Sequence, residues 1–218
     1  MWYTILPFTL INMPPMHTEV LTAEQKELLP IVRKFKSNFG LVGGTALTLH
    51  IGHRESIDFD LFSPKEFQNI KIRQVFFRAG KKIQVLRNST GEFTFVVDKV
   101  RMTFFYFPYS IEYSESFEDI VKLPSLLTLA AMKAFALGQR SKWKDYVDMY
   151  FIMRDFLSLE EITQKAEKLF SAEFNAKLFR QQLSYFQDID YREEVIFKPG
   201  FEVSQEEIKK QLIAFSLG

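Results

Sequence analysis

The first half of the chain alternates short apolar runs with turns, and this pattern predicts a mixed α/β structure. Strands are expected at residues 39–42, 57–62, 83–87, 93–97 and 100–107, the last three forming an antiparallel meander. Helices are expected from the capping box at 22–25 to residue 35, at 45–51 and at 66–78. Gly52 is expected to end the second of these helices.

Beyond Pro108 the apolar residues recur at helical spacing. Helices are expected at 125–137, 142–156 and 175–186, and capping boxes at 158–161 and 204–207 begin two more. The sequence therefore predicts an α+β protein in two parts. Residues 1–110 form a mixed sheet flanked by helices, with an N-terminal arm, and residues 111–218 form an all-helical region.

The opening segment, residues 1–16, is apolar, but Pro7, Pro14 and Pro15 interrupt it, and its first residues include no Lys or Arg. A signal peptide has a basic start, and a membrane span needs about 20 uninterrupted apolar residues. The segment is therefore expected to be a strand or arm packed on the core, and no membrane contact is expected.

Composition narrows the classes of function. Apolar residues make up 47% of the 218 positions and include 24 Phe, which predicts a sizeable core with thick sheet–helix packing. The net charge of +1 disfavours a protein that coats long nucleic acids, but it permits binding of a nucleotide or a short RNA end. The absence of cysteine excludes disulfides and thiolate chemistry and fits the cytoplasm.

Two glycines and a threonine, Gly43, Gly44 and Thr45, stand between an expected strand and an expected helix. Glycines allow the backbone to approach an anion closely, and the first N–H groups of a helix point toward it. Thr45 can add a hydroxyl to a phosphate. The alternative is a tight strand-to-helix connection without a ligand.

Two carboxylates, Asp58 and Asp60, follow on the next expected strand. Residues i and i+2 of a strand project from the same face, so these carboxylates point to one place. Burying them side by side is costly unless they share a cation, and Mg²⁺ (or Mn²⁺) suits oxygen ligands and phosphates. The alternative is a solvated pair at a strand end, bound to Arg54.

These residues resemble the AbiEii/AbiGii-type nucleotidyltransferases of the DNA polymerase β-like superfamily. The match comprises Gly43-Gly-Thr-Ala-Leu47, then His53-Arg54-x-Ser56 and Asp58-x-Asp60-Leu-Phe62. The stretches 144–150 and 183–190 also resemble the helical half of that family. The resemblance covers most of the chain.

The resemblance implies a nucleotidyltransferase fold and the transfer of a nucleoside monophosphate from an NTP to a hydroxyl. Some relatives are toxins countered by an antitoxin protein, and some modify the acceptor end of tRNA. It implies that Asp58 and Asp60 bind the metal, and that Arg54 and Ser56 assist Gly43, Gly44 and Thr45 in binding the nucleotide. A lysine and an aspartate of the helical half complete such sites.

Lys133 is the candidate for that lysine, because it is the only charged residue between Pro124 and Gly138. A buried ammonium needs an anionic partner, and a triphosphate would serve. The alternatives are a lysine whose tip reaches solvent and one paired with a structural carboxylate. For the aspartate the resemblance favours Asp148, with Asp145 second.

Many enzymes of this superfamily carry a third carboxylate on a later strand. The expected strand at 100–107 offers Thr103 but no acid, and Asp98 and Glu92 fall at expected turns. Either Asp148 supplies the missing charge, or catalysis is weak or lost.

Further polar residues carry weaker signals. A basic run between Lys65 and Arg87 predicts either a landing surface for RNA or the wet face of a helix and strand. Arg140 and Lys142 are candidates for phosphate contacts or are simply solvated. His50 and His53 either face the aspartate pair or, as is slightly favoured, are buried and hydrogen-bonded.

Three hypotheses follow from the sequence. The first is a metal-dependent nucleotidyltransferase with Asp58, Asp60, Lys133 and Asp148 as catalytic residues, an NTP as substrate and tRNA or another RNA end as acceptor. The second is a module of the same fold that binds a nucleotide or a partner without turnover. The third is transfer to a small molecule of the aminoglycoside type.

Overall fold

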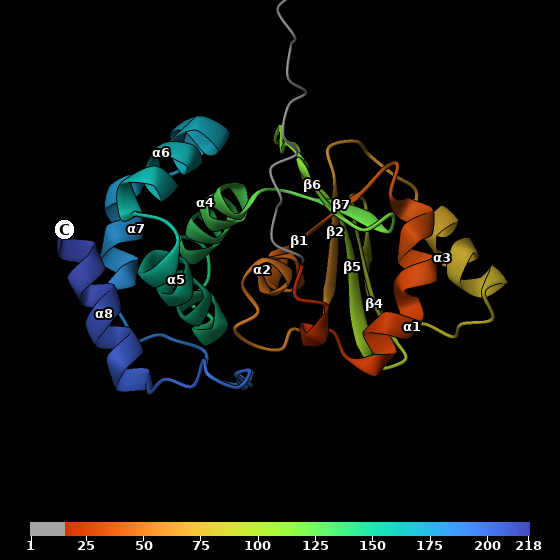
Figure 1. The fold of residues 1–218 in the computed structure, drawn as a ribbon. Coiled ribbons are helices and arrows are strands. Elements are labelled where there is room, and N and C mark those ends of the chain that lie inside the picture. The colour runs from red at the N-terminus through yellow and green to blue at the C-terminus, as the bar shows by residue number, and fades with distance from the viewer. Residues whose placement is uncertain (1–15) are drawn as a thin grey trace, which may run out of the picture.

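A five-stranded mixed sheet lies at the centre of the computed structural model, which describes residues 16–218 (Figure 1). Its strands are β1 (Gly40–Val42), β2 (Phe59–Ser63), β3 (Gln84–Ser89), β4 (Glu92–Val97) and β5 (Val100–Tyr106), in the order β1-β2-β5-β4-β3. β2 and β5 are parallel and the other neighbours are antiparallel. The predicted α+β fold and its antiparallel meander are confirmed. The arm predicted for residues 1–16 lies almost wholly outside the described residues.

The two faces of the sheet differ in chemistry because side chains alternate along each strand. One face is mainly apolar and carries Phe59 and Leu61 of β2 and Phe104 of β5. The other face places Asp60 directly beside Thr103, which in turn lies beside Thr94. The polar face therefore holds the candidate metal ligands.

Two helices, α1 (Ala23–Val32) and α3 (Asn69–Arg78), cover the apolar face (Figure 1). The predicted capping box begins α1, since Thr22 and Gln25 bond reciprocally. Phenylalanine rings pack between these helices and the sheet. The ring centroids of Phe35 and Phe104 are 4.8 Å apart, and those of Phe76 and Phe95 are 4.9 Å apart. The thick packing predicted from the phenylalanine content is confirmed.

Helix α2 (Gly43–Ile51) starts directly after β1 and packs on the polar side of the sheet. Gly43 has φ +71°, a left-handed conformation that suits glycine. Gly52 ends the helix with φ +79°, as predicted.

Five further helices form the C-terminal region on the same side as α2 (Figure 1). They are α4 (Leu126–Leu137), α5 (Trp143–Asp155), α6 (Leu159–Phe170), α7 (Ala176–Leu183) and α8 (Gln205–Leu217). The capping box predicted at Ser158 is complete, whereas Ser204 caps α8 with its hydroxyl alone. Within residues 16–218, no helix combines the length and the apolar character that a membrane crossing requires.

The prediction of an all-helical second half was wrong in one place. Strands β6 (Glu115–Phe117) and β7 (Val121–Leu123) form an antiparallel hairpin that lies against β1. Each strand has only three residues, too few to show a period of two in the sequence.

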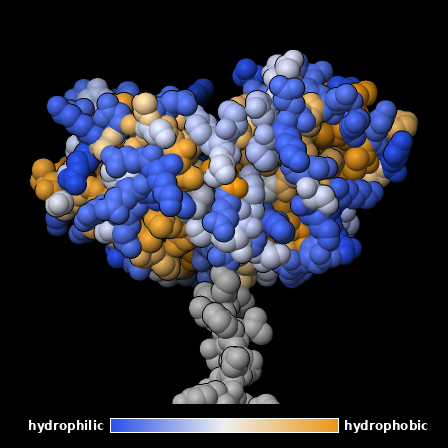
Figure 2. All heavy atoms as spheres, turned by 90° about the horizontal axis from the view of Figure 1, so that it is seen from above, coloured by the Kyte–Doolittle hydropathy of each residue, from blue (hydrophilic) through white to orange (hydrophobic). Residues whose placement is uncertain are grey.

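Hydrophilic residues cover most of the face of the molecule seen from above, and the apolar areas between them are separate (Figure 2).

Candidate functional site

A cavity of about 500 Å³ lies between the polar face of the sheet, the start of α2, and helices α4 and α5. We call it the central cavity. Its walls combine acidic residues of the sheet, basic residues of the helical region and several aromatic rings, and they include Gly43, Gly44, Arg54, Ser56, Asp58, Asp60, Phe62, Glu92, Thr94, Arg101, Thr103, Phe105, Phe107, Lys133, Phe135, Arg140, Lys142, Lys144, Asp145 and Glu193. Most of the residues that the sequence suggested for the site therefore meet in one place.

Asp58 and Asp60 enter the cavity from β2 and the residue before it. Burial, and after it the negative charge of Asp58, raise the pKa of the Asp60 carboxyl above its usual range. Arg101 of β5 forms an ion pair with Asp58, in place of the Arg54 pairing that the sequence left open. Two oxygen-donor side chains on one face, one of them hard to ionise alone, fit a shared divalent cation.

The described residues contain no group of three or more carboxylate or histidine side chains suited to one metal ion. A cation held by Asp58 and Asp60 would therefore complete its coordination with water and with phosphate oxygens of a substrate, which is the usual arrangement for Mg²⁺.

At Gly43 and Gly44, neighbouring side chains leave no room for a Cβ atom. A Cβ atom on Gly43 would lie 2.3 Å from Oδ2 of Asp60, and one on Gly44 would lie 2.8 Å from Oγ of Ser56. The first N–H groups of a helix have no partner within it, so these glycines expose α2's N–H groups beside the carboxylates. The sequence-based view of a backbone cradle fits this geometry.

Thr45 lies differently from what the sequence suggested. Its hydroxyl is buried, donates to the carbonyl of Asp58 and lies 3.1 Å from Oγ of Ser56. Thr45 does not line the central cavity, so it holds the 56–58 loop in place instead of offering its hydroxyl to a phosphate. His50 is also turned away, with Nε2 3.0 Å from the carbonyl of Pro124.

Asp148 lies beneath the cavity at the centre of a buried ion-pair network. Its Oδ1 accepts from Arg54 Nε at 2.7 Å and from His53 Nε2 at 2.8 Å. Its Oδ2 accepts from Arg54 Nη2 at 2.8 Å and lies 2.8 Å from Lys133 Nζ. Asp148 is completely inaccessible to solvent and is absent from the cavity wall. It is therefore placed to position Arg54 and Lys133, and the catalytic role expected for it stays a prediction.

Lys133 also contacts Asp145, with 2.8 Å between Nζ and Oδ1, and it reaches the cavity wall. The structure thus shows the pairing with carboxylates that the sequence left as an alternative, in a position that still faces a ligand. Burial alone would lower the pKa of Lys133, but the charges of Asp145 and Asp148 outweigh it and raise that pKa. Burial would raise the pKa of Asp148, yet Arg54 and Lys133 hold it well below its usual range.

His53 shares this buried network instead of facing Asp58 and Asp60. Burial lowers the pKa of its imidazole despite the contact with Asp148. The neutral ring donates from Nε2, and Nδ1 has no hydrogen-bond partner among the described residues. His53 therefore acts here as a buried structural histidine.

Three further cations line the rim of the central cavity. Arg140 Nε lies 2.9 Å from Asp145 Oδ2, and Lys142 and Lys144 share Glu193 at 2.6 and 3.2 Å. All three residues precede or begin α5, so this segment brings positive charge opposite the sheet. The suggestion that Arg140 and Lys142 contact phosphates fits this placement.

Glu92 is a cavity residue that the sequence interpretation set aside. It begins β4 and lines the cavity, with an ion pair of 2.9 Å to Arg87. The placement at a turn was wrong, and the alternation of Glu92 and Thr94 with the buried Phe93 and Phe95 is the signal that could have found it. As predicted, β5 contributes Thr103 and no acid.

The basic residues between Lys65 and Arg87 are divided among different contacts. Lys81 pairs with Asp98 and Arg87 with Glu92, and Arg73 lies over the ring of Phe93. Lys65 and Lys71 line a second hollow, which is separate from the central cavity.

Comparison with known proteins shows which family this arrangement belongs to. Residues 31–214 match the sequence model of the family described as "Nucleotidyl transferase AbiEii toxin, Type IV TA system". The chain belongs to the AbiEii family of nucleotidyltransferase toxins. The resemblance found in the sequence is thereby confirmed.

Relatives of this AbiEii protein include "Uncharacterized protein aq_aa25" of Aquifex aeolicus, 32% identical over 204 residues, with 88% of this chain and 96% of the relative covered. The crystal structure of JHP933 from Helicobacter pylori has a TM-score of 0.57 at 16% identity and covers 89% of both chains. MenT4, a nucleotidyltransferase toxin of Mycobacterium tuberculosis, has a TM-score of 0.59 at 12% identity and covers 89% of this chain and 82% of its own. Both structural likenesses confirm the nucleotidyltransferase-like fold.

Replacing Asp148 by Ala is expected to lower the free energy of unfolding of this AbiEii protein by about 3–5 kcal/mol, because Arg54 and Lys133 would lose a buried counter-charge. Replacing Asp155, which ends the same helix and forms an exposed pair with Arg154, is expected to cost about 1 kcal/mol or less. Urea unfolding of both variants measures the difference. Equal losses would show that the buried network does not stabilise the fold.

Replacing Asp60 by Asn is expected to stabilise the fold by on the order of 1 kcal/mol at neutral pH. A raised pKa means that ionising Asp60 costs the folded state free energy. The gain should be absent below about pH 4, where Asp is protonated in the unfolded chain too, and should grow as pH rises through the raised pKa. Thermal unfolding from pH 4 to pH 8 measures this, and a pH-independent difference would contradict it.

Proposed function

We propose that this AbiEii protein transfers a nucleoside monophosphate from an NTP to a hydroxyl at the end of an RNA, with tRNA as the acceptor. The observation that carries the proposal is the opposition of charges across the central cavity. Asp58 and Asp60 lie on the sheet side, and Arg54, Lys133 and Arg140 approach from the other. A triphosphate bound to a divalent cation fits between two such walls.

The triphosphate lies at the end of the cavity formed by Gly43 and Gly44. There the N–H groups at the start of α2 face the phosphates, and Arg54 and Lys133, fixed by Asp148, contribute positive charge. A divalent cation held by Asp58 and Asp60 would neutralise charge that develops at the α-phosphorus.

Transfer follows as an in-line displacement at the α-phosphorus. A bond forms between the acceptor oxygen and that phosphorus, the bond to the β-phosphate oxygen breaks, and pyrophosphate leaves. The acceptor proton passes to solvent. Lys133 and Arg140 lie where charge on the leaving group can be compensated, so positioning and electrostatics supply most of the rate.

The nucleobase lies at the opposite, aromatic end of the cavity. Phe62, Phe105 and Phe107 all line it, and the Phe62 ring lies 5.2 Å from each of the other two. These rings are only partly buried, so an aromatic surface is open to a stacked base. Glu92 and Thr94 beside them offer hydrogen-bond acceptors to its edge.

The toxin part of the family description supports a role in the cytoplasm, where NTPs and tRNA occur, with an antitoxin protein as the partner that limits the activity. The cavity also has room for a small hydroxylated acceptor, so the first experiment includes both classes of acceptor.

Incubation with each α-labelled NTP, Mg²⁺ and total tRNA is expected to label the tRNA, and the Asp58→Asn variant is expected to lose at least about 10³-fold in rate because charge stabilisation is lost. Omitting Mg²⁺ or adding a chelator should have the same effect, and Mn²⁺ should restore transfer. Label on an aminoglycoside panel but not on RNA would replace RNA as the acceptor. Nucleotide binding without label on either would favour a non-catalytic module.

Replacing Phe105 by Ala is expected to weaken NTP binding about 10- to 100-fold, because base–aromatic stacking contributes about 1–3 kcal/mol. Inorganic tripolyphosphate, which has no base, should bind the variant and the wild type equally. Calorimetric titration of both ligands measures this. Phe77→Ala, which removes an aromatic ring that is 80% exposed and outside the cavity, is the matched control. Equal loss for both ligands would place the base elsewhere.

A further inference from the structure

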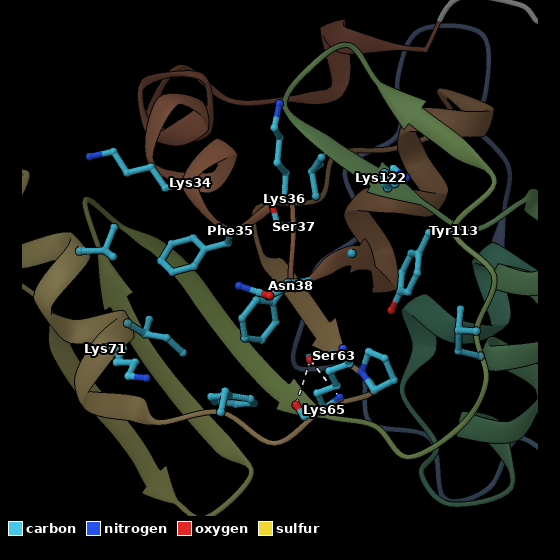
Figure 3. Close-up of a pocket in the computed structure, with 18 of the residues that line it drawn as sticks. Lys34, Phe35, Lys36, Ser37, Asn38, Ser63, Lys65, Lys71, Tyr113 and Lys122 are labelled. Atoms are coloured by element: carbon cyan, nitrogen blue, oxygen red, sulfur yellow. Dashed lines mark hydrogen bonds between the residues drawn. The ribbon is translucent and has the colours of Figure 1, made fainter.

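The protein has a second hollow, of about 1190 Å³, which shares no lining residue with the central cavity (Figure 3). It is bounded by three segments: residues 34–40 before and into β1, residues 63–75 from the end of β2 into α3, and residues 111–122 around the β6–β7 hairpin. Lysines from each of these segments surround it, namely Lys34, Lys36, Lys65, Lys71 and Lys122. We call this hollow the lysine groove.

The wall of the lysine groove carries a net positive charge, since five lysines stand against three acids. Lys36 pairs with Asp119, which also binds Arg33, and these two cations hold the pKa of Asp119 down to about 2. The other four lysines of the groove have no carboxylate at ion-pair distance among residues 16–218. Glu66 and Glu118 are the remaining acids of its wall. In a chain with a net charge of only +1, this is a local concentration of positive charge.

Two neutral polar side chains also line the groove. Asn38 is exposed, and Ser63 is buried with its hydroxyl donating to the carbonyl of Lys65 at 2.9 Å (Figure 3). Tyr113 forms one wall, and its hydroxyl donates to the carbonyl of Phe62 at 3.3 Å. Burial raises the pKa of Tyr113 to about 12, so this donor stays protonated at neutral pH.

The lysine groove lies close to the reaction centre along the sheet. Ser63 lines the groove and Asp60 lines the central cavity, and the two are three residues apart on β2, roughly 10 Å at the usual rise of a strand. Because three is an odd number, their side chains lie on opposite faces of the sheet, so an RNA that used both hollows would pass around the end of β2. On β1, Gly40 of the groove and Gly43 of the cavity are also three residues apart. The Phe62 ring faces the cavity while its carbonyl accepts from Tyr113 of the groove.

We propose that the lysine groove binds the sugar–phosphate backbone of the acceptor RNA while the end of that RNA occupies the central cavity. The proposal rests on the function proposed above and adds the place where the body of the RNA is held. Lysines act on phosphates as mobile point charges, which position an RNA without reading its sequence.

An acidic protein is the other polyanion that the groove would attract, and the wall chemistry argues against it. Protein interfaces are depleted in lysine and depend on large apolar anchors, whereas nucleic-acid interfaces are polar and positive. Apolar side chains do line part of the groove, including the half-buried Phe67, Val75 and Ile111, but none of the strongly exposed large apolar side chains within residues 16–218 lies there. The groove therefore fits RNA better than a protein partner.

The test compares two triple variants of the full chain with the same change of charge. The groove variant is Lys65→Glu, Lys71→Glu and Lys122→Glu. The control variant is Lys26→Glu, Lys168→Glu and Lys177→Glu, which changes three exposed lysines outside both hollows. Thermal unfolding and NTP affinity of each verify that the fold is retained.

The groove variant is expected to bind labelled tRNA about 10- to 100-fold more weakly than the control at 0.1 M salt. The slope of log affinity against log salt should fall by about 2–3, since each phosphate contact contributes roughly 0.7–0.9. The KM for tRNA should rise in parallel.

Equal tRNA binding by the groove and control variants, while the wild type transfers nucleotide to tRNA, would overturn the groove assignment and leave the proposed function intact. Loss of affinity for a protein partner with unchanged tRNA binding would overturn it as well. A wild type that binds and labels no RNA would overturn the proposed function itself, and the groove assignment with it.

Discussion

The buried carboxylate of Asp148 is the interaction on which the rest of the site depends. It joins residues 53 and 54, which follow α2, to Lys133 of α4, and it does so from α5. Removing four polar groups from water is costly, and an apolar cluster of the same size would often be as stable. The gain lies in geometry: both cations are fixed with their charges toward the central cavity before any nucleotide arrives, so little reorganisation is needed on binding.

Charge is divided across the cavity with opposite excess on the two walls. On the helical side, five cations (Arg54, Lys133, Arg140, Lys142 and Lys144) stand against three acids (Asp145, Asp148 and Glu193), so two positive charges are left over. On the sheet side, Arg101 pairs with Asp58 and leaves Asp60 with a raised pKa. Each wall is thus incompletely balanced alone. A bound anion would balance the charge of the helical wall, and a bound cation would balance the charge of the sheet wall. The folded protein keeps these unbalanced charges, and binding of the ligands relieves them.

The sequence alone predicted most of the helices and strands and the aspartate pair, because both depend on local periodicity, but not the short β6–β7 hairpin. The alternation around Asp58 and Asp60 places them on one face of β2 whatever packs above. It did not predict where Thr45 and Asp148 point. Thr45 bonds to the 56–58 loop and Asp148 to a loop some 94 positions earlier in the chain, and such partners are set by tertiary packing. Glu92 was missed for the opposite reason: its strand pattern was visible, but an expected turn was given more weight than the alternation.

The division of the chain near residue 110 was also predictable only in part from the sequence. The change from mixed to helical patterning is visible in the sequence and corresponds to the sheet and the C-terminal helices. Yet the segment around residues 196–198 returns to pair with residues 53–55 through backbone hydrogen bonds, and the β6–β7 hairpin returns to β1. Arg54 and His53 would lose both Asp148 and the helices that bury them if the first part stood alone, and Asp148 would lose Arg54 and His53 if the second did. The buried charges of each part are therefore paired with charges of the other part, and the central cavity lies where the two parts meet.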